Sequence, residues 1–191
     1  MGESEQSMSS LPADTVANAG RWRTISAWPE MQRPTALWSW LEHPGSLTEK
    51  LRAVAGESFH VEVLNEAEVT LSAEDAGFLG VASGTPARLR EVYLSGSAPL
   101  VFGRTLAPVG EAADWLAQLG AQPLGDRVFA EANAMRGEIE VRQVDAADAF
   151  YRDAVCGLTA PPATVWVRRS VLSVQASRLL IYEAFFPGVN Q

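Results

Sequence analysis

The sequence contains few of the residues that form metal centres, disulfides and membrane spans. Its 191 residues include one cysteine, Cys156, and two histidines. One cysteine cannot form an internal disulfide, and a four-ligand zinc site would need carboxylates in addition to these residues. No run approaches 18 apolar residues, and the acidic N-terminus lacks the apolar core of a signal peptide. We therefore expect no metal, no redox centre, no stable membrane insertion and a cytoplasmic location.

Basic residues are also few, with 15 Lys and Arg against 23 Asp and Glu and a formal net charge of −8. Nucleic-acid-binding proteins need clustered basic side chains that displace counterions from phosphates. The charge balance therefore argues against nucleic acid as a partner. Apolar residues make up 47% of the chain, and a chain of this length buries roughly 70% of its unfolded surface. The composition predicts a single globular domain.

The apolar pattern divides the chain into an N-terminal extension and one domain. Residues 1–34 are expected to be a partly disordered extension, and residues 35–191 the folded domain. Helical spacing predicts two short helices around 37–41 and 47–55, the second capped by Ser46 and ended by Gly56.

Strands and helices alternate over the rest of the domain. Residues 65–86 are expected to be a mainly polar connection. Alternating, β-branched segments predict six strands, at 59–64, 87–94, 100–109, 135–144, 164–174 and 178–187. Two further helices are expected, at 111–119 and 146–155. Short turns and few, clustered helices indicate an α+β fold on a largely antiparallel sheet.

Charged residues inside apolar strands are the main functional signal. Glu183 shares a strand face with Leu179, Ile181 and Phe185, and a buried carboxylate needs a partner or a raised pKa. Arg90 shares a face with Val92 and Leu94. One interpretation is a structural Arg90–Glu183 ion pair, or charged faces that are simply solvated. The other is an anion-binding arginine opposite a carboxylate that handles a hydroxyl or a proton.

Other charged and reactive residues give weaker signals. Arg104 is a third charge within a strand, and the pattern does not decide between a structural role and an anion contact. Arg168 and Arg169, beside Trp166, are expected to lie on a solvated strand edge. The chain has no dinucleotide-binding loop, phosphate loop or nucleophile elbow, and we interpret Cys156 as an inert thiol.

In these residues the chain resembles the chorismate lyase family, which makes 4-hydroxybenzoate for ubiquinone. The resemblance covers residues 37–187, and its short matching pieces are specific because they occur in the same order at compatible spacing. They are Trp40-Leu41, Ser46-Leu47-Thr48, Leu89-Arg90-Glu91, Gly103-Arg104-Thr105 with Pro108-Val109, Leu119-Gly120, Pro123-Leu124-Gly125, Trp166 with Arg168-Arg169-Ser170, and Glu183 with Phe186-Pro187. The chain departs from the family in a longer N-terminal extension and a longer connection at 145–163.

The resemblance implies a six-stranded antiparallel sheet with helices packed on one side and helical flaps over a buried ligand site. It implies that Arg90, Glu183 and backbone groups at Leu47 and Leu124 hold the ring carboxylate and hydroxyl. Our hypothesis adds Arg104 as a contact for the enolpyruvyl carboxylate and a pKa of Glu183 raised by apolar surroundings.

The resemblance also implies an activity. The implied enzyme is a monomeric, cofactor-independent lyase that eliminates pyruvate from chorismate, so that its partners are chorismate and 4-hydroxybenzoate. The alternative is a non-catalytic module of the same fold that binds aromatic acids. The 35 or so residues before the first matched helix have no helix-turn-helix pattern, which argues against a DNA-binding regulator.

Overall fold

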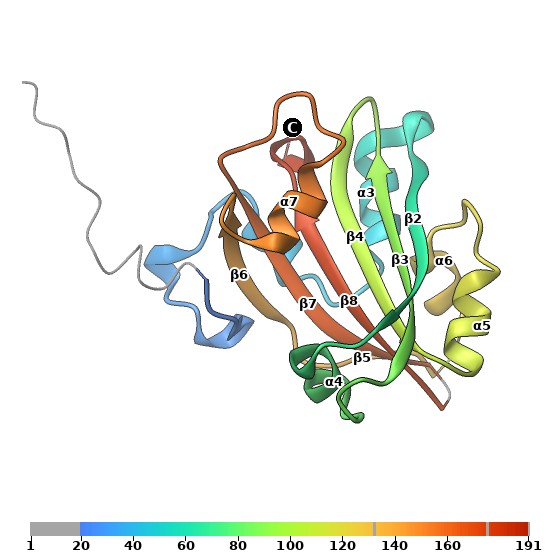
Figure 1. Cartoon of the computed structure of the whole chain (residues 1–191). Helices are drawn as coiled ribbons and strands as arrows, with labels where there is room; N and C mark the ends of the chain where they lie inside the picture. Colours follow the sequence, from blue (N-terminus) through green and yellow to red (C-terminus); the bar gives the residue numbers. More distant parts are fainter. Residues whose placement is uncertain (1–19, 132, 175, 191) are drawn as a thin grey trace, which may run out of the picture.

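The computed structural model describes residues 20–131, 133–174 and 176–190. Within them the strands form one antiparallel sheet in the order β1-β6-β7-β8-β4-β3-β2, and β5 pairs with β7 (Figure 1). The six longer strands are β2 (His60–Thr70), β3 (Pro86–Ser95), β4 (Pro99–Pro108), β6 (Glu140–Asp145), β7 (Thr164–Val174) and β8 (Ser177–Phe185). The two short ones are β1 (Arg23–Thr24) and β5 (Met135–Arg136). The α+β, antiparallel prediction is confirmed.

The helices are short and connect or flank the strands. The α-helices are α2 (Trp38–Leu41), α3 (Leu47–Ala55), α4 (Ala73–Leu79), α5 (Glu111–Ala117), α6 (Leu124–Val128) and α7 (Ala149–Val155). The 3-10 turns are η1 (Ile25–Ala27), η2 (Glu30–Gln32), η3 (Gly56–Ser58) and η4 (Pro187–Asn190). In the described part of the chain, no helix has the length and apolar character needed to cross a bilayer.

Local capping explains where two of these helices begin and end. The Ser46 side chain accepts a hydrogen bond from the Glu49 amide at 3.3 Å, and Gly56 ends α3 with a φ of 58°, as predicted. Helix α4 lies in the stretch expected to be a connection. Its N-cap Ser72 accepts from the Asp75 amide at 3.1 Å, and the left-handed Gly80 ends it. The signal for α4 was therefore present in its caps rather than in its hydrophobic period.

The expected count of six strands is too low by the two short strands. The predicted strand 135–144 divides into β5 and β6, because the Gly137 amide donates to the Val171 carbonyl at 2.8 Å and the chain shifts before pairing resumes at Glu140. Strand β1 pairs with β6 and lies in the segment assigned to the N-terminal extension. Two-residue strands carry no periodicity that a sequence pattern can detect.

The expectation that helices pack on one side of the sheet is wrong. Figure 1 shows α7 crossing one face of β7 and β8, with α3 on the opposite face of the sheet. Residues of α4 and α7 pack with Leu180, Tyr182 and Ala184 of β8. Residues of α2 and α3 pack near Phe185, and α5 packs near Leu179 and Ile181 on the other face. Helices are needed on both faces because the central strands are apolar on both.

The described part of the N-terminal segment contacts the sheet. The Trp28 side chain is 5% exposed, and its indole N–H donates to the Val141 carbonyl at 3.3 Å. Its ring meets Trp166 edge to face, with centroids 5.0 Å apart. The expected extension covers residues 1–34, of which residues 1–19 lie outside the described residues and the segment from Arg23 to Trp28 packs on the sheet.

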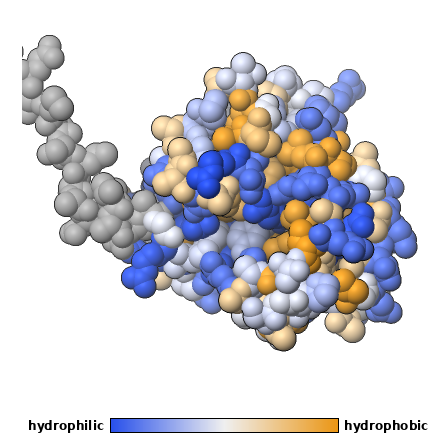
Figure 2. Space-filling view, viewed as in Figure 1, coloured by the Kyte–Doolittle hydropathy of each residue, from blue (hydrophilic) through white to orange (hydrophobic). Residues whose placement is uncertain are grey.

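The surface fits the acidic composition. Figure 2 shows hydrophilic side chains over much of one face, with hydrophobic side chains in separate patches between them. Among the described residues, the exposed large apolar side chains come from distant parts of the chain, namely Met31, Val54, Val63, Val109 and Met135. Scattered exposure of this kind is normal and marks no single interaction surface.

Replacement of Leu180 tests the position of the core. Leu180 is fully buried in β8, where it pairs with Val171 and Leu106. We expect Leu180→Ala to lower the free energy of unfolding by about 3 kcal/mol, through lost burial and a residual cavity. The matched control Val109→Ala, at a side chain 65% exposed, should change it by less than about 0.5 kcal/mol. Urea unfolding followed by tryptophan fluorescence measures both, and equal effects would contradict the placement of β8.

Candidate functional site

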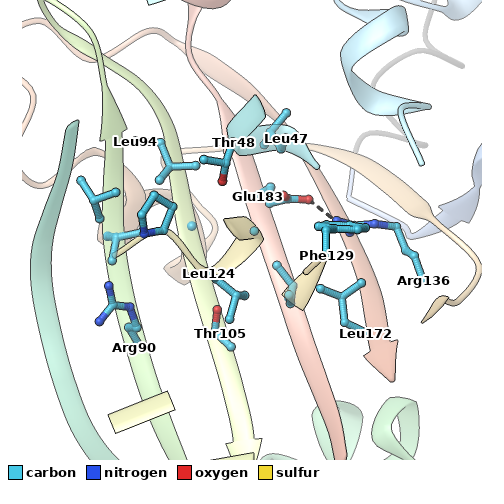
Figure 3. Close-up of a pocket in the computed structure, with 16 residues that line it drawn as sticks. Leu47, Thr48, Arg90, Leu94, Thr105, Leu124, Phe129, Arg136, Leu172 and Glu183 are labelled. Carbon is cyan, nitrogen blue, oxygen red and sulfur yellow. Dashed lines mark ion pairs between the residues drawn. The ribbon is translucent and has the colours of Figure 1, made fainter. Parts of the chain in front are cut away.

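A pocket lies between the sheet and helices α3 and α6 (Figure 3). The cavity itself has a volume of about 50 Å³, and the empty space reaches about 570 Å³ when the part open to solvent is included. Among the described residues that line it, the charged ones are Arg90, Arg136 and Glu183, and most of the others are apolar. The uncharged lining residues are Leu47, Thr48, Val61, Val92, Leu94, Gly103, Thr105, Pro123, Leu124, Gly125, Phe129, Leu172 and Ile181. The structure thus brings Leu47, Arg90, Leu124 and Glu183 to one place.

Arg90 lies on β3 and is 3% exposed. Its Nη1 donates to Glu66 at 2.7 Å, directly across from it on β2. Its Nη2 donates to the carbonyls of Gly120 and Gln122 at 2.7 and 3.3 Å. Arg90 therefore has a carboxylate partner other than Glu183, and the interpretation of a structural Arg90–Glu183 pair is wrong.

Glu183 lies on β8, where β-sheet pairing places it opposite Arg168 of β7. Arg168 Nε donates to Glu183 Oε2 at 2.5 Å, and Arg136 Nη1 lies 3.6 Å from the same oxygen. Burial by itself would raise the pKa of Glu183, but the guanidinium groups of Arg168 and Arg136 lower it below its usual value. The expectation of a raised pKa is wrong because it did not include these two cations. Glu183 is ionised at neutral pH.

Arg168 and Arg169 do not lie on a solvated edge, contrary to expectation. Strand β7 is an interior strand between β6 and β8, so the side chains on both of its faces are covered. Arg168 is fully buried, and its Nη1 donates to the carbonyls of Trp40, Leu41 and His43 at 2.9, 3.3 and 2.8 Å. These carbonyls belong to the end of α2, where a helix has free acceptors.

Arg169 faces the other side of the sheet. It pairs with Glu140 at 2.7 Å and Glu74 at 2.5 Å. Its guanidinium lies 4.2 Å from the ring centroid of Trp22 and 4.3 Å from that of Phe78. Two neighbouring arginines are therefore stabilised by separate acidic partners on opposite faces, and these partners are distant in sequence.

Arg136 is a site residue that the sequence analysis missed. Its Nη1 donates to the Ser170 hydroxyl at 2.5 Å, and its side chain is 6% exposed. Burial lowers the pKa of Arg136 to about 10, with Arg168 acting in the same direction and Glu183 opposing it. The residue lies in the predicted strand 135–144, but this strand divides into β5 and β6 in the structure, and alternation alone did not indicate a contact with Glu183. Only the approach of β5 to β7 brings it to Glu183.

Leu47 and Leu124 are the first residues of α3 and α6, and both line the pocket. The two helices meet at Gly125, where an added Cβ would lie 2.6 Å from Thr48 Oγ1. Arg52 of α3 and Asp126 of α6 also form a two-point ion pair, at 2.7 and 2.6 Å. This close contact holds the starts of both helices at the pocket. That they act as flaps stays a prediction.

Arg104 is not brought to the pocket. It lies on β4 one residue from Gly103 and Thr105, which line the pocket, so its side chain points to the opposite face. There its Nε donates to Glu91 at 2.7 Å, and its Nη2 donates to Asp153 at 2.6 Å.

The family model and the sequence relatives of this chain indicate the same family. The sequence model of the family described as "Chorismate lyase" matches residues 21–190. Three relatives, each named "Probable chorismate pyruvate-lyase", are similar over most of their length. A protein of Azoarcus sp. strain BH72 is 35% identical over 78% of this chain and 83% of its own. A protein of Pseudomonas aeruginosa UCBPP-PA14 is 38% identical over 82% of this chain and 85% of its own. A protein of Pseudoalteromonas translucida is 30% identical over 91% of this chain and 95% of its own.

Among solved structures, the effector domain of PhnF from Mycobacterium smegmatis is similar in fold. The TM-score is 0.54 at 18% identity, covering 75% of this chain and 90% of that domain. An identity this low shows a shared fold only.

Removal of the buried carboxylate tests the charge arrangement. At pH 7, Glu183→Gln leaves Arg168 and Arg136 without a counter-charge, and we expect it to lower the free energy of unfolding by about 3–5 kcal/mol. Because the folded-state pKa of Glu183 is lowered, its stabilising contribution is complete above the unfolded pKa of about 4.3. Below that pH the contribution falls by about 1.4 kcal/mol per unit. The difference in free energy of unfolding between wild type and Glu183→Gln should therefore become smaller as the pH falls below about 4.3.

Urea unfolding between pH 7 and pH 3 measures this difference. Asp126→Asn is the matched control, because Asp126 forms a surface ion pair with a side-chain exposure of 37%. It should cost less than about 1 kcal/mol. A Glu183→Gln effect that stayed constant down to pH 3 would contradict the lowered pKa.

Proposed function

The chain belongs to the chorismate lyase family, and on this premise we propose that it eliminates pyruvate from chorismate to give 4-hydroxybenzoate for ubiquinone. The observation that supports the proposal is the convergence of Arg90, Glu183, Leu47 and Leu124 on one small, mostly apolar pocket. These residues come from β3, β8, α3 and α6. Family membership makes the reaction class a lyase, and we assign the substrate to this pocket.

The charges of the pocket fit the polar groups of the substrate. Chorismate carries its ring carboxylate and its C4 hydroxyl at opposite ends of the ring. Arg90 and Glu183 project into the pocket from separate strands, with Leu124 between them in Figure 3. We assign Arg90, with the backbone N–H groups of Leu47 and Leu124, to the ring carboxylate. Glu183 is assigned to the C4 hydroxyl.

The reaction breaks the C4–H and C3–O bonds and moves two protons, one away from C4 and one to the released enolpyruvate. The C4–H bond loses its proton, its electron pair completes the aromatic ring, and the C3–O bond breaks so that enolpyruvate leaves with that bond's electrons. Enolpyruvate then takes up a proton to become pyruvate. Aromatisation drives the step, and the atoms balance without a cofactor. The protein contributes orientation, charge complementarity and exclusion of water.

Glu183 acts in this scheme as an ionised acceptor. Since the two arginines lower its pKa, it remains a carboxylate at neutral pH and accepts a hydrogen bond from the C4 hydroxyl. It also assists the transfer of the C4 proton. A carboxylate is a weak base, but it suffices here because the ring becomes aromatic when the proton leaves. Helices α3 and α6 would have to separate for the substrate to reach the pocket and for the product to leave.

We further propose that the protein acts as a cytoplasmic monomer.

Turnover of chorismate tests the proposed function. Purified protein dialysed against EDTA should release 4-hydroxybenzoate and pyruvate in equal amounts. We expect Arg90→Met and Glu183→Gln each to lower kcat/KM by about 100-fold or more, because each removes a charge-assisted contact to the substrate. Arg104→Met is the control, since Arg104 faces the opposite side of the sheet, and it should stay within about threefold of wild type.

Two outcomes would overturn the proposed activity, and a third would overturn the assignment of its site. Binding of 4-hydroxybenzoate without turnover would indicate a non-catalytic module that binds aromatic acids. Absence of both turnover and binding would leave the pocket charges with a structural role only. A large loss in Arg104→Met, with circular dichroism showing a folded protein, would return Arg104 to the site in place of the pocket residues.

A further inference from the structure

An ion-pair cluster of two arginines and one glutamate lies at each end of the pocket. At one end, Arg90 and Arg88 share Glu66, at 2.7 and 3.6 Å. At the other end, Arg168 and Arg136 share Glu183, at 2.5 and 3.6 Å. Among the described residues that form these ion pairs, each end therefore has one cation in excess. The surroundings favour one anionic group of a ligand at each end.

The excess positive charge at the Glu183 end destabilises the protein more than the excess at the Arg90 end, because it is more deeply buried. The side chains of Arg88 and Glu66 are 28% and 27% exposed, so water screens that end. The side chains of Arg168, Arg136 and Glu183 are between 0% and 8% exposed. Nearby His43 adds no charge at pH 7, since burial and the charges of Lys50 and Arg168 lower its pKa. The second cation at this end is therefore buried, with little screening by water.

The two arginines at this end differ in how they are engaged. Arg168 donates to Glu183 and to three carbonyls of α2 and its following turn, and it does not line the pocket. Each arginine has one buried nitrogen without a hydrogen-bond partner among the described residues, Arg168 Nη2 and Arg136 Nε, but of the two it is Arg136 that lines the pocket. Figure 3 shows its guanidinium extending toward Glu183 at the side of the pocket. Arg136 is thus the cation at this end that a ligand can reach.

We propose that Arg136 binds the carboxylate of the enolpyruvyl group and selects a dianionic substrate, an inference that rests on the proposed function. The enolpyruvyl ether is attached at C3, next to the C4 carbon whose hydroxyl Glu183 holds. Its carboxylate therefore has to lie near Glu183, which would repel it without a cation. Arg104, the residue first considered for this role, is on the opposite face.

This assignment predicts that Arg136 contributes to the affinity for the substrate but not to that for the product. Chorismate carries two carboxylates, whereas 4-hydroxybenzoate keeps only the one at Arg90. Arg136 therefore binds the substrate and the leaving enolpyruvate but contributes little to the affinity for 4-hydroxybenzoate. Negative charge also develops on the ether oxygen as the C3–O bond breaks, and a guanidinium beside it stabilises that charge.

The test compares ligands that differ in a single charge. The dianionic probe is 3-(carboxymethoxy)-4-hydroxybenzoate, its uncharged counterpart is the amide 3-(carbamoylmethoxy)-4-hydroxybenzoate, and 4-hydroxybenzoate represents the product. Calorimetry should show that wild-type protein prefers the acid over the amide by roughly 10- to 100-fold, as expected for a hydrogen bond between charged groups. Arg136→Met should reduce this preference to less than about threefold and leave 4-hydroxybenzoate affinity within about threefold.

Other variants separate charge recognition from a structural role. Arg136→Lys should restore part of the preference, because the charge remains although the two-point geometry is lost. Arg90→Met should weaken all three ligands. Arg178→Met, at an exposed position of β8, should change nothing. With chorismate, Arg136→Met should raise KM and lower kcat.

Three results would overturn the inference. The first is a wild-type protein that binds acid and amide equally, a result that needs no variant to fold. The second is an Arg136→Met or Arg136→Lys protein that loses affinity for all three ligands by the same factor, which would mean that Arg136 acts only through Glu183. The third is an unchanged preference in a folded Arg136→Met. Failure of the proposed function is separate, since it appears as wild-type protein that forms no 4-hydroxybenzoate whatever the probes show.

Discussion

The buried ion pair between Arg168 and Glu183 is the interaction on which the site depends. It joins the neighbouring central strands β7 and β8. The same guanidinium also donates hydrogen bonds to three carbonyls at and just after the end of α2. Without Arg168, only the more distant Arg136 would oppose the effect of burial on the pKa of Glu183, and the end of α2 would lose its hydrogen-bond donor. One side chain thus sets both the charge of the pocket and the position of the helices beside it.

Alternation along β7 and β8 divides polar residues between the two faces of the sheet. Arg168 and Glu183 serve the pocket face, whereas Arg169 and Tyr182, each one residue away, serve the other face. There the Tyr182 hydroxyl donates to Asp75 of α4 at 2.5 Å. Burial, together with Asp75, raises the pKa of Tyr182 above its usual value. Polar contacts on that face hold α4 against the sheet. The candidate ligand pocket lies on the opposite face.

The acidic net charge and the cationic pocket are compatible because they occupy different dielectric environments. Surface carboxylates are solvated, and their fields are screened within about 10 Å at ordinary ionic strength. The pocket arginines are buried, so each acts on a ligand through a medium that screens much less. A formal charge of −8 therefore argues against a nucleic-acid surface more strongly than against a small anionic ligand, which meets the local charge only after it has left water.

The sequence by itself determined the antiparallel α+β fold, the cap of α3, and the strand faces of Arg90 and Glu183, because alternation and capping are local properties. The family resemblance indicated that Leu47 and Leu124 belong with them. Only the tertiary structure decided that Arg168 is buried, that Arg136 lies beside Glu183, and that helices cover both faces. Alternation assigns a side chain to a face, but the residue that meets it depends on strand order and register. For Arg136 and Glu183, which are distant in sequence, packing of the whole sheet sets that register.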